Sequence, residues 1–194
     1  MKPHNFFYGV LLLLIFFLSN TSVAQNVTNH EPQYEKTIQD IGDFVHVGMP
    51  IAVGVTTLII GDKKGTWQFA KGFGVNLAAT FVLKYTINKP RPNGATDGHA
   101  FPSGHTSVAF QSASFLQRRY GWKYGIPAYA LAGFVAYSRI DGANDRHDGW
   151  DILAGAIIGV GSTYLFTTPY EQEHLQLSFS SKDQNYLLGL NYKF

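Results

Sequence analysis

The chain of 194 residues contains no cysteine. Disulfide bonds, thiolate catalysis and cysteine-based zinc sites are therefore excluded, and stability must come from packing. Charged residues are also few, at 14%, and the 15 basic and 13 acidic residues form no long run of one sign. This pattern argues against a broad nucleic-acid-binding surface. With 45% hydrophobic residues, the composition predicts one compact domain with an apolar core.

The N-terminus has the pattern of a secretory signal peptide. Lys2 supplies positive charge, residues 6–18 form an apolar segment, and small residues precede a cleavage point after Ala24. The apolar segment is shorter than the ~20 residues of a spanning helix, and a retained membrane anchor is the alternative. We predict that residues 1–24 are removed on export to the periplasm or cell envelope, and that residues 25–170 form the main domain.

Helical periodicity dominates the next 140 residues or so. Apolar residues recur at helical spacing from Tyr34 to Val45, and another apolar run covers residues 50–60. Further helices are predicted over residues 66–87, 103–119, 124–140 and 149–166, because proline, glycine, asparagine and aspartate separate these segments. Residues 124–137 and 152–166 are strongly apolar but shorter than 18 uninterrupted apolar residues, which favours buried core helices over membrane spans.

The C-terminal 24 residues change to an alternating pattern. Leu175, Leu177 and Phe179 alternate with polar residues, as do the apolar residues after position 187, and residues 181–185 have turn composition. We predict a short β-hairpin within residues 171–194, lying on the helical body or pairing with another chain.

Two cations stand out at the end of the predicted helix 66–87. Lys84 shares a helix face with Leu77 and Phe81, and a lysine on an inward face either binds an anion or extends from the core edge to water. Arg91 lies between Pro90 and Pro92, on a backbone with little freedom. A guanidinium held in this way suits bidentate phosphate contact, although a simple loop arginine is the alternative.

The next motif is Pro102-Ser103-Gly104-His105. Ser103 is a predicted N-cap, so the amides of Gly104 and His105 come at the start of an apolar helix, where oxyanions bind. His105 could then give a proton to a leaving oxygen. The alternative is an ordinary serine-capped helix with a surface histidine.

The third motif pairs a histidine with a carboxylate. His147 precedes Asp151 by four residues, a spacing at which the carboxylate can accept a hydrogen bond from one ring nitrogen. The other nitrogen would then stay basic and nucleophilic. Alternatively, Asp148 caps a helix that has Asp151 in its first turn, and His147 merely precedes it.

In this order, the three motifs resemble the signature of the type 2 phosphatidic acid phosphatase and vanadium haloperoxidase superfamily. The resemblance covers residues 84–159 and implies an all-α helical bundle of the acid phosphatase type, with the predicted hairpin added. It implies that five residues bind phosphate, and these are Lys84, Arg91, Ser103, Gly104 and Arg139. It also implies that His147 attacks phosphorus, that Asp151 orients His147, and that His105 protonates the leaving alcohol and then activates water. No metal or other cofactor is required.

One spacing departs from the family pattern. Seven residues separate Arg139 from His147, where the family usually has five. Because residues 141–145 have loop composition, two extra residues could form a bulge without displacing Arg139. Arg146, beside His147, is the alternative third cation.

The sequence therefore predicts a metal-independent phosphatase that acts on phosphate monoesters or pyrophosphates through a phosphohistidine. The resemblance favours a lipid phosphate as substrate and allows association with a membrane surface, while the oligomeric state stays open. A vanadium-dependent haloperoxidase is the runner-up, because a phosphate site also holds vanadate. A catalytically silent envelope scaffold is the third reading, motivated by the hairpin and the altered spacing.

Overall fold

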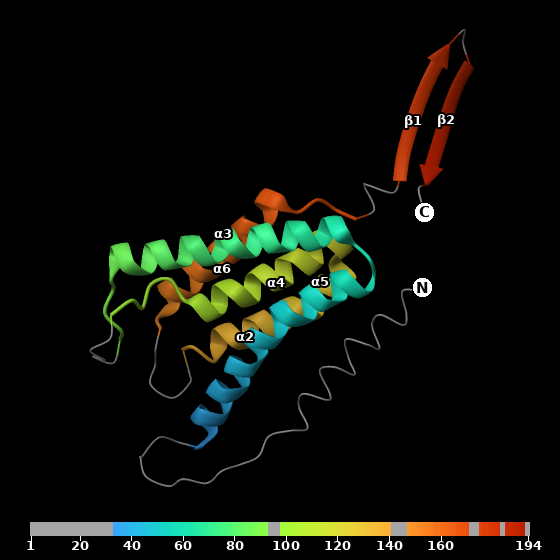
Figure 1. The fold of residues 1–194 in the computed structure, drawn as a ribbon. Helices are drawn as coiled ribbons and strands as arrows, with labels where there is room; N and C mark the ends of the chain where they lie inside the picture. The colour runs from blue at the N-terminus through green and yellow to red at the C-terminus, as the bar shows by residue number, and fades with distance from the viewer. Residues whose placement is uncertain (1–32, 93–97, 141–146, 171–174, 183–184, 193–194) are drawn as a thin grey trace. The chain divides into compact units, whose positions relative to one another are not determined.

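The computed structural model describes residues 33–92, 98–140, 147–170, 175–182 and 185–192. The described part of the chain contains five helices followed by two strands (Figure 1). The helices are α2 (Gln33–Ile59), α3 (Lys63–Ile87), α4 (Gly104–Tyr120), α5 (Trp122–Tyr137) and α6 (Gly149–Phe166). The all-α prediction is confirmed. The predicted signal peptide lies outside the described residues.

The central element is α4, which packs against α2, α3, α5 and α6. Ten of its 17 residues are buried, and most of them are small. Alanines of α4 join Val45 and Met49 of α2 in one apolar cluster, while Phe115 joins Phe69 of α3 in another. The predicted apolar character of this helix was wrong in part, because it also buries four serine and threonine side chains. Small side chains let four helices approach one helix closely.

The approach of α6 to α4 depends on glycine. A Cβ on Gly155 would lie only 2.5 Å from the carbonyl oxygen of Ser103, too close for any other residue without a backbone shift. The backbone N–H of Ser103 in turn donates to the carbonyl of Asp151 at 2.9 Å. The first turns of α4 and α6 are therefore fixed side by side, and they carry the second and third motifs.

Two local predictions about helices need correction. The segments starting at Tyr34 and Pro50 form one continuous helix, α2, with Pro50 in its interior. Burial of Val45, Met49 and Val53 on both sides of the proline outweighs the one backbone hydrogen bond that proline cannot make. α5 ends at Tyr137, three residues earlier than predicted.

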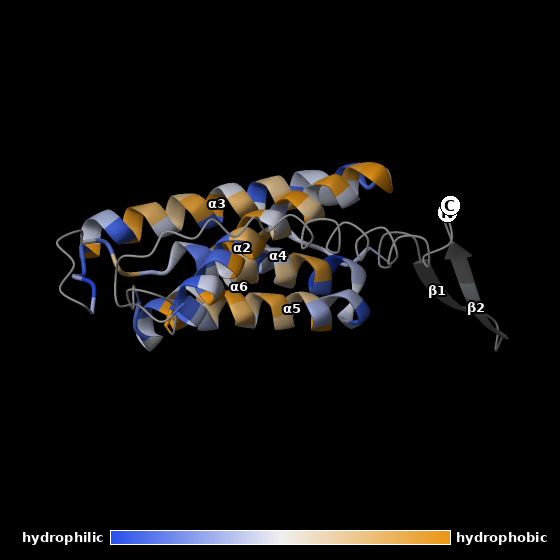
Figure 2. Ribbon diagram, turned by 90° about the horizontal axis from the view of Figure 1, so that it is seen from below, coloured by the Kyte–Doolittle hydropathy of each residue, from blue (hydrophilic) through white to orange (hydrophobic). Residues whose placement is uncertain are grey.

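The prediction of buried core helices was also wrong for both segments, because α5 exposes Ile126 (66%) and α6 is exposed on one face as well. This helix exposes Trp150 (72%), Ile157 (62%) and Leu165 (71%). By length and composition, α2 and α6 could each cross a membrane. In Figure 2, orange apolar segments run along much of α5, whereas on α3 they alternate with white and blue ones. On α6 the buried residues are mostly small, and several large apolar residues are left on the outside.

The C-terminal strands β1 (Leu175–Lys182) and β2 (Asn185–Tyr192) pair antiparallel. Leu175 is opposite Tyr192 at one end of the pair, and Lys182 is opposite Asn185 at the other. β1 continues three residues past Phe179, and β2 starts three residues before Leu188, so both strands begin or end closer to one another than the predicted alternating segments.

Candidate active site

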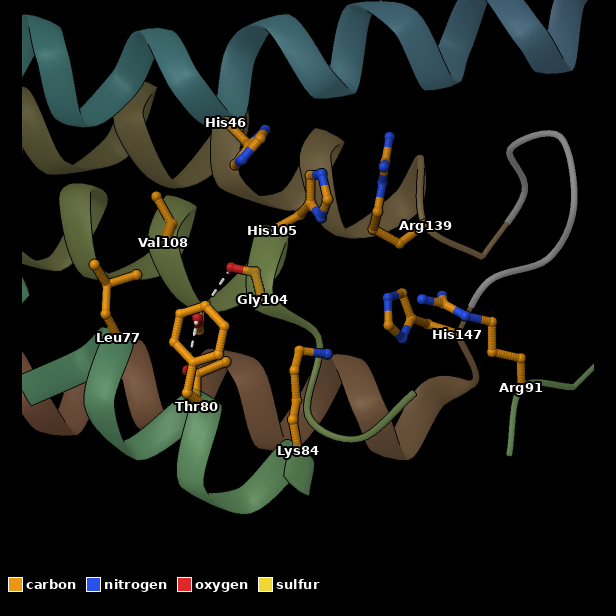
Figure 3. A pocket seen from close by; sticks show the side chains of 12 residues that line it. His46, Leu77, Thr80, Lys84, Arg91, Gly104, His105, Val108, Arg139 and His147 are labelled. Carbon is orange, nitrogen blue, oxygen red and sulfur yellow. Dashed lines mark hydrogen bonds between the residues drawn. The ribbon is translucent and has the colours of Figure 1, made fainter. Parts of the chain in front are cut away.

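Six of the eight predicted site residues line one pocket, which has a volume of about 320 Å³ (Figure 3). These six are Lys84, Arg91, Gly104, His105, Arg139 and His147. They come from the end of α3, the segment after it, the first turn of α4, the turn after α5 and the segment before α6. The pocket therefore unites residues from all three motifs.

The cations from the first motif depend on how α3 ends. Asn88 adopts a left-handed conformation as the C-cap, and its N–H donates to the carbonyl of Lys84. The chain turns there, so Arg91 reaches the same pocket as Lys84. The Nζ of Lys84 donates to the carbonyl of His99 at 2.8 Å, which holds the ammonium group near the start of α4.

Ser103 is the N-cap of α4, as predicted, but it lies beneath the pocket rather than on its wall. Its side chain is fully buried, and its Oγ accepts hydrogen bonds from the N–H and the hydroxyl of Thr106. Gly104, the next residue, does line the pocket. In this arrangement Ser103 supports the helix start, and the open end of α4 faces the cavity.

Asp151 is fully buried and lies against His147. The Nδ1 of His147 is 3.4 Å from Oδ2 of Asp151. Both readings of the third motif hold together, because Asp148 caps α6 while the side chain of Asp151 accepts from the N–H of Asp148, a capping box. With the proton on Nδ1, the other ring nitrogen keeps its lone pair.

The electrostatics of the pocket keep His147 neutral. Burial, followed by the positive charge of Lys84, lowers the pKa of His147 to about 4, although the charge of Asp151 opposes the shift. A neutral imidazole at ordinary pH is the form that can act as a nucleophile.

Lys89 belongs to the site and was not predicted. Its ammonium group donates to Oδ2 of Asp148 and, at 2.7 Å, to Oδ1 of Asp151. This contact lowers the pKa of the Asp148 carboxyl. Because Lys89 lies only two residues before Arg91, it could have been noticed as a third basic residue in the first motif.

Helix α2 contributes further residues that sequence reasoning missed. Asp43 accepts a hydrogen bond from Arg139 Nη1 at 2.6 Å, and the backbone carbonyl of Gln39 accepts from Nη2 at 2.9 Å. His46 lines the pocket, and its ring centroid is 4.0 Å from that of His105. Gln39, Asp43 and His46 follow at helical spacing, a polar stripe that could have indicated a functional face.

The question of the third cation has a partial answer. Arg139 lines the pocket and its side chain is 3% exposed, while Arg146 lies outside the described residues. The two extra residues between Arg139 and His147 fall in the same undescribed segment.

Among the residues that the structure describes, one group of side chains has ligand atoms close enough to hold a metal ion. Ligand atoms of Asp43, His46 and His105 all lie within 4.8 Å of one another. The guanidinium of Arg139 already bonds to Asp43, however, and a second cation at that carboxylate would be repelled.

The pocket therefore combines positive side chains, the start of a helix and three histidines, His46, His105 and His147. Arginine and lysine favour binding of an anion, and the backbone amides of a helix start add donors for its oxygens. Tetrahedral oxyanions such as phosphate fit this chemistry. A neutral imidazole in the same pocket can attack the central atom of such an anion.

Comparison with known proteins agrees with this chemistry. Residues 65–174 match the PAP2 superfamily. The chain is 32% identical over 150 residues to a lipid A 4'-phosphatase of Helicobacter pylori, a match that covers 72% of this chain and 74% of that protein. It is 39% identical over 80 residues to a lipid A 1-phosphatase of Porphyromonas gingivalis, which covers 40% of this chain but 17% of that protein.

The fold has a counterpart among solved structures. The crystal structure of Aquifex aeolicus LpxE superposes with a TM-score of 0.59 at 19% identity, covering 80% of this chain and 92% of that one. The shared helical fold and the matched family segment lead to one conclusion. The chain belongs to the PAP2 superfamily, and it is a phosphoric ester hydrolase of the PAP2 type.

Proposed function

We propose that this hydrolase removes a phosphate group from a lipid of the lipid A class, at a membrane of the cell envelope, through a phosphohistidine. The observation that carries the proposal is the single pocket that joins Lys84, Arg91 and Arg139 to His105 and His147. The substrate class is supported by the lipid A 4'-phosphatase that shares 32% identity over most of its length.

Phosphate binding is assigned to the cations and the start of α4. Lys84, Arg91 and Arg139 neutralise the phosphoryl oxygens, and the backbone at Gly104 adds amide donors. These groups also stabilise the charge on the equatorial oxygens in the transition state, where fixed donors have their greatest effect. Ser103 fixes the helix start from below.

The first chemical step breaks the ester bond. The unprotonated nitrogen of His147 attacks phosphorus, and the bond between phosphorus and the leaving oxygen breaks. His105, in its protonated form, gives its proton to that oxygen, so the alcohol leaves neutral. Asp151 compensates the positive charge that forms on the ring of His147, with which it is paired in the structure.

The second step restores the enzyme. His105, now neutral, takes a proton from water, and the resulting hydroxide attacks phosphorus. The bond between phosphorus and nitrogen breaks, inorganic phosphate leaves, and His147 regains its neutral form. His105 ends protonated, so the cycle balances in protons.

Association with a membrane is supported by the exposed apolar residues. Helices α2 and α6 are each long and apolar enough to cross a bilayer. Trp150, Ile157 and Leu165 on α6 would contact lipid instead of water. A lipid substrate could then reach the pocket without leaving the membrane. We further propose that the segment before Gln25 is a cleaved signal peptide, which mass measurement of the mature N-terminus tests.

The test uses the full chain purified in detergent. We expect phosphate release from bis-phosphorylated lipid A without added vanadate, and mass spectrometry of the product identifies which phosphate is lost. His147→Ala should abolish acid-labile phosphoenzyme. His105→Ala should still form it from an ester with a good leaving group, because only proton transfer is impaired. Labelling that persists in His147→Ala would place the nucleophile elsewhere.

A further inference from the structure

Asp43 lies outside the three motifs and outside the matched family segment, residues 65–174. Its Oδ1 atom nevertheless makes two contacts in the pocket region. Arg139 Nη1 is 2.6 Å away, and Nε2 of His105 is 3.2 Å away. One carboxylate oxygen thus joins the third cation to the histidine assigned as acid.

Local packing shows that this contact is built into the fold. A Cβ on Gly42 would overlap the side chain of Ser138 and lie 3.0 Å from Arg139 Nη2, so only glycine allows α2 this close to the end of α5. Gln39, one turn before Asp43, holds the same guanidinium through its backbone carbonyl. Arg139 therefore donates hydrogen bonds to two successive turns of α2, and its side chain is 3% exposed.

We propose that Asp43 is a positioning residue for the acid step: it orients the ring of His105 and favours its protonated form, while it holds Arg139 in the phosphate site. The proposal rests on the proposed function. It gives the pocket two histidine–aspartate pairs, with Asp151 serving the nucleophile and Asp43 serving the acid.

Charge explains why the acid needs this partner. Lys84, Arg91 and Arg139 line the same pocket as His105, and they all disfavour an additional positive charge on its ring. His46 lies against His105 from α2, and His147 faces the pocket from the segment before α6. Asp43 is the carboxylate in contact with His105 among the described residues, so it offsets the neighbouring cations.

The test compares two esters whose leaving groups differ in their need for a proton. Nitrophenolate leaves from p-nitrophenyl phosphate without protonation, whereas the alkoxide of dodecyl phosphate requires an acid. Asp43→Asn should lower kcat for both esters, but the decrease for dodecyl phosphate should be roughly tenfold or more greater than the decrease for p-nitrophenyl phosphate. The reason is that general acid catalysis contributes about 10²–10⁴-fold. His105→Ala should show the same selectivity. The pH above which kcat for the alkyl ester falls should shift downward in Asp43→Asn.

The controls separate this role from others. Asp40→Asn, at an exposed position one turn away on α2, should leave both rates unchanged. Asp43→Glu should restore part of the kcat for dodecyl phosphate that Asp43→Asn loses. It also serves as the test variant if Asp43→Asn fails to fold.

Three results would overturn the assignment of Asp43. If kcat fell equally for both esters, Asp43 would only hold Arg139 in place. If both rates were unchanged, Asp43 would have no role in the site. Activity that EDTA abolishes and Zn²⁺ restores would make Asp43 a metal ligand instead. If the wild-type chain released no phosphate from either ester or from lipid A, the proposed function would fall, and this proposal with it.

Discussion

The ammonium group of Lys89 lies 2.7 Å from Oδ1 of Asp151. Oδ2 of the same carboxylate is occupied by His147 and by the N–H of Asp148. Each oxygen of Asp151 therefore has a defined task, and Lys89 prevents the carboxylate from rotating away from His147. Lys89, which lies between Lys84 and Arg91 of the first motif, thus acts on His147 through Asp151.

Replacement of Lys89 should impair the chemical step more than binding. Because a hydrogen bond to a charged group contributes about 1.5–3 kcal/mol, Lys89→Met should lower kcat roughly tenfold to a hundredfold with a small change in KM. Lys89→Arg should recover much of the rate, since it keeps the positive charge. Steady-state kinetics on lipid A and on p-nitrophenyl phosphate measure both. A rise in KM at constant kcat would show instead that Lys89 contacts substrate.

The third cation can be assigned by comparing two arginines. Arg139 lines the pocket, so Arg139→Ala should reduce kcat/KM by about 10²-fold or more, the typical effect of removing a fixed donor to transition-state charge. Arg146→Ala should have a much smaller effect. The opposite ranking would give the role to Arg146.

The charge state of His147 should be visible in solution. Burial and the charge of Lys84 lower its pKa from 6.5 to about 4, so nuclear magnetic resonance of labelled histidine should show a neutral ring down to that pH. Lys84→Met removes one of these causes and should raise the pKa. A His147 signal that titrates near 6.5 in the wild-type chain would contradict this account.

The same shift has a consequence for stability. Below pH 6.5 the unfolded chain binds a proton at His147 that the folded chain does not bind until about pH 4. The free energy of unfolding should therefore decrease as the pH falls from 6.5 to about 4. Denaturation of His147→Gln in detergent, compared with the wild type at several pH values, should show a smaller decrease.

Removing one partner of the buried ion pair at the start of α3 should lower the stability of the fold without changing the residues of the pocket. Arg119 donates to both carboxylate oxygens of Asp62, at 2.7 and 2.6 Å, and Tyr120 donates to one of them at 2.8 Å. Arg119→Met leaves the buried carboxylate poorly compensated and should cost about 3–5 kcal/mol. Thermal unfolding followed by circular dichroism measures the loss. Asp62→Asn combined with Arg119→Met should be less harmful than Arg119→Met alone.

The pH dependence of this pair follows from the carboxyl. Burial alone would raise the pKa of Asp62, but hydrogen bonds from Arg119 and from the N–H of Gly65 outweigh it and lower the pKa below 3.8. The stabilisation is complete above that value and is lost as the pH falls through the lower pKa of the folded state. The free energies of unfolding of Arg119→Met and the wild type should therefore become equal only in strong acid.

Much of the helical architecture could be predicted because the signals were local. The predicted bounds of the last helix, residues 149–166, agree with α6, since Asp148 is a strong N-cap and the apolar run ends at Phe166. Pro50 misled the prediction because its effect depends on what the flanking turns bury, which is a tertiary property. The exposure of Ile157 and Leu165 likewise depends on which face α4 covers.

The site was predictable only where its residues belong to ordered motifs. Lys84, His105 and His147 could be named because their spacing matches a known pattern. Asp43 could not, since its contact with Arg139 joins positions 96 residues apart. Ser103 was identified correctly as a cap, but whether its hydroxyl faces the pocket is decided by the packing of α4 against α6.

The capping box at the start of α6 joins folding and catalysis in one atom. Oδ2 of Asp151 closes the first turn of the helix and also contacts His147. The ring of His147, the proposed nucleophile, is consequently aligned only while that turn is wound, so under the proposed mechanism fraying of a single helical turn would abolish activity without any change in the pocket cations. Asp151→Ala is thus a probe of helix initiation as much as of chemistry, and the loss of activity it causes measures both together.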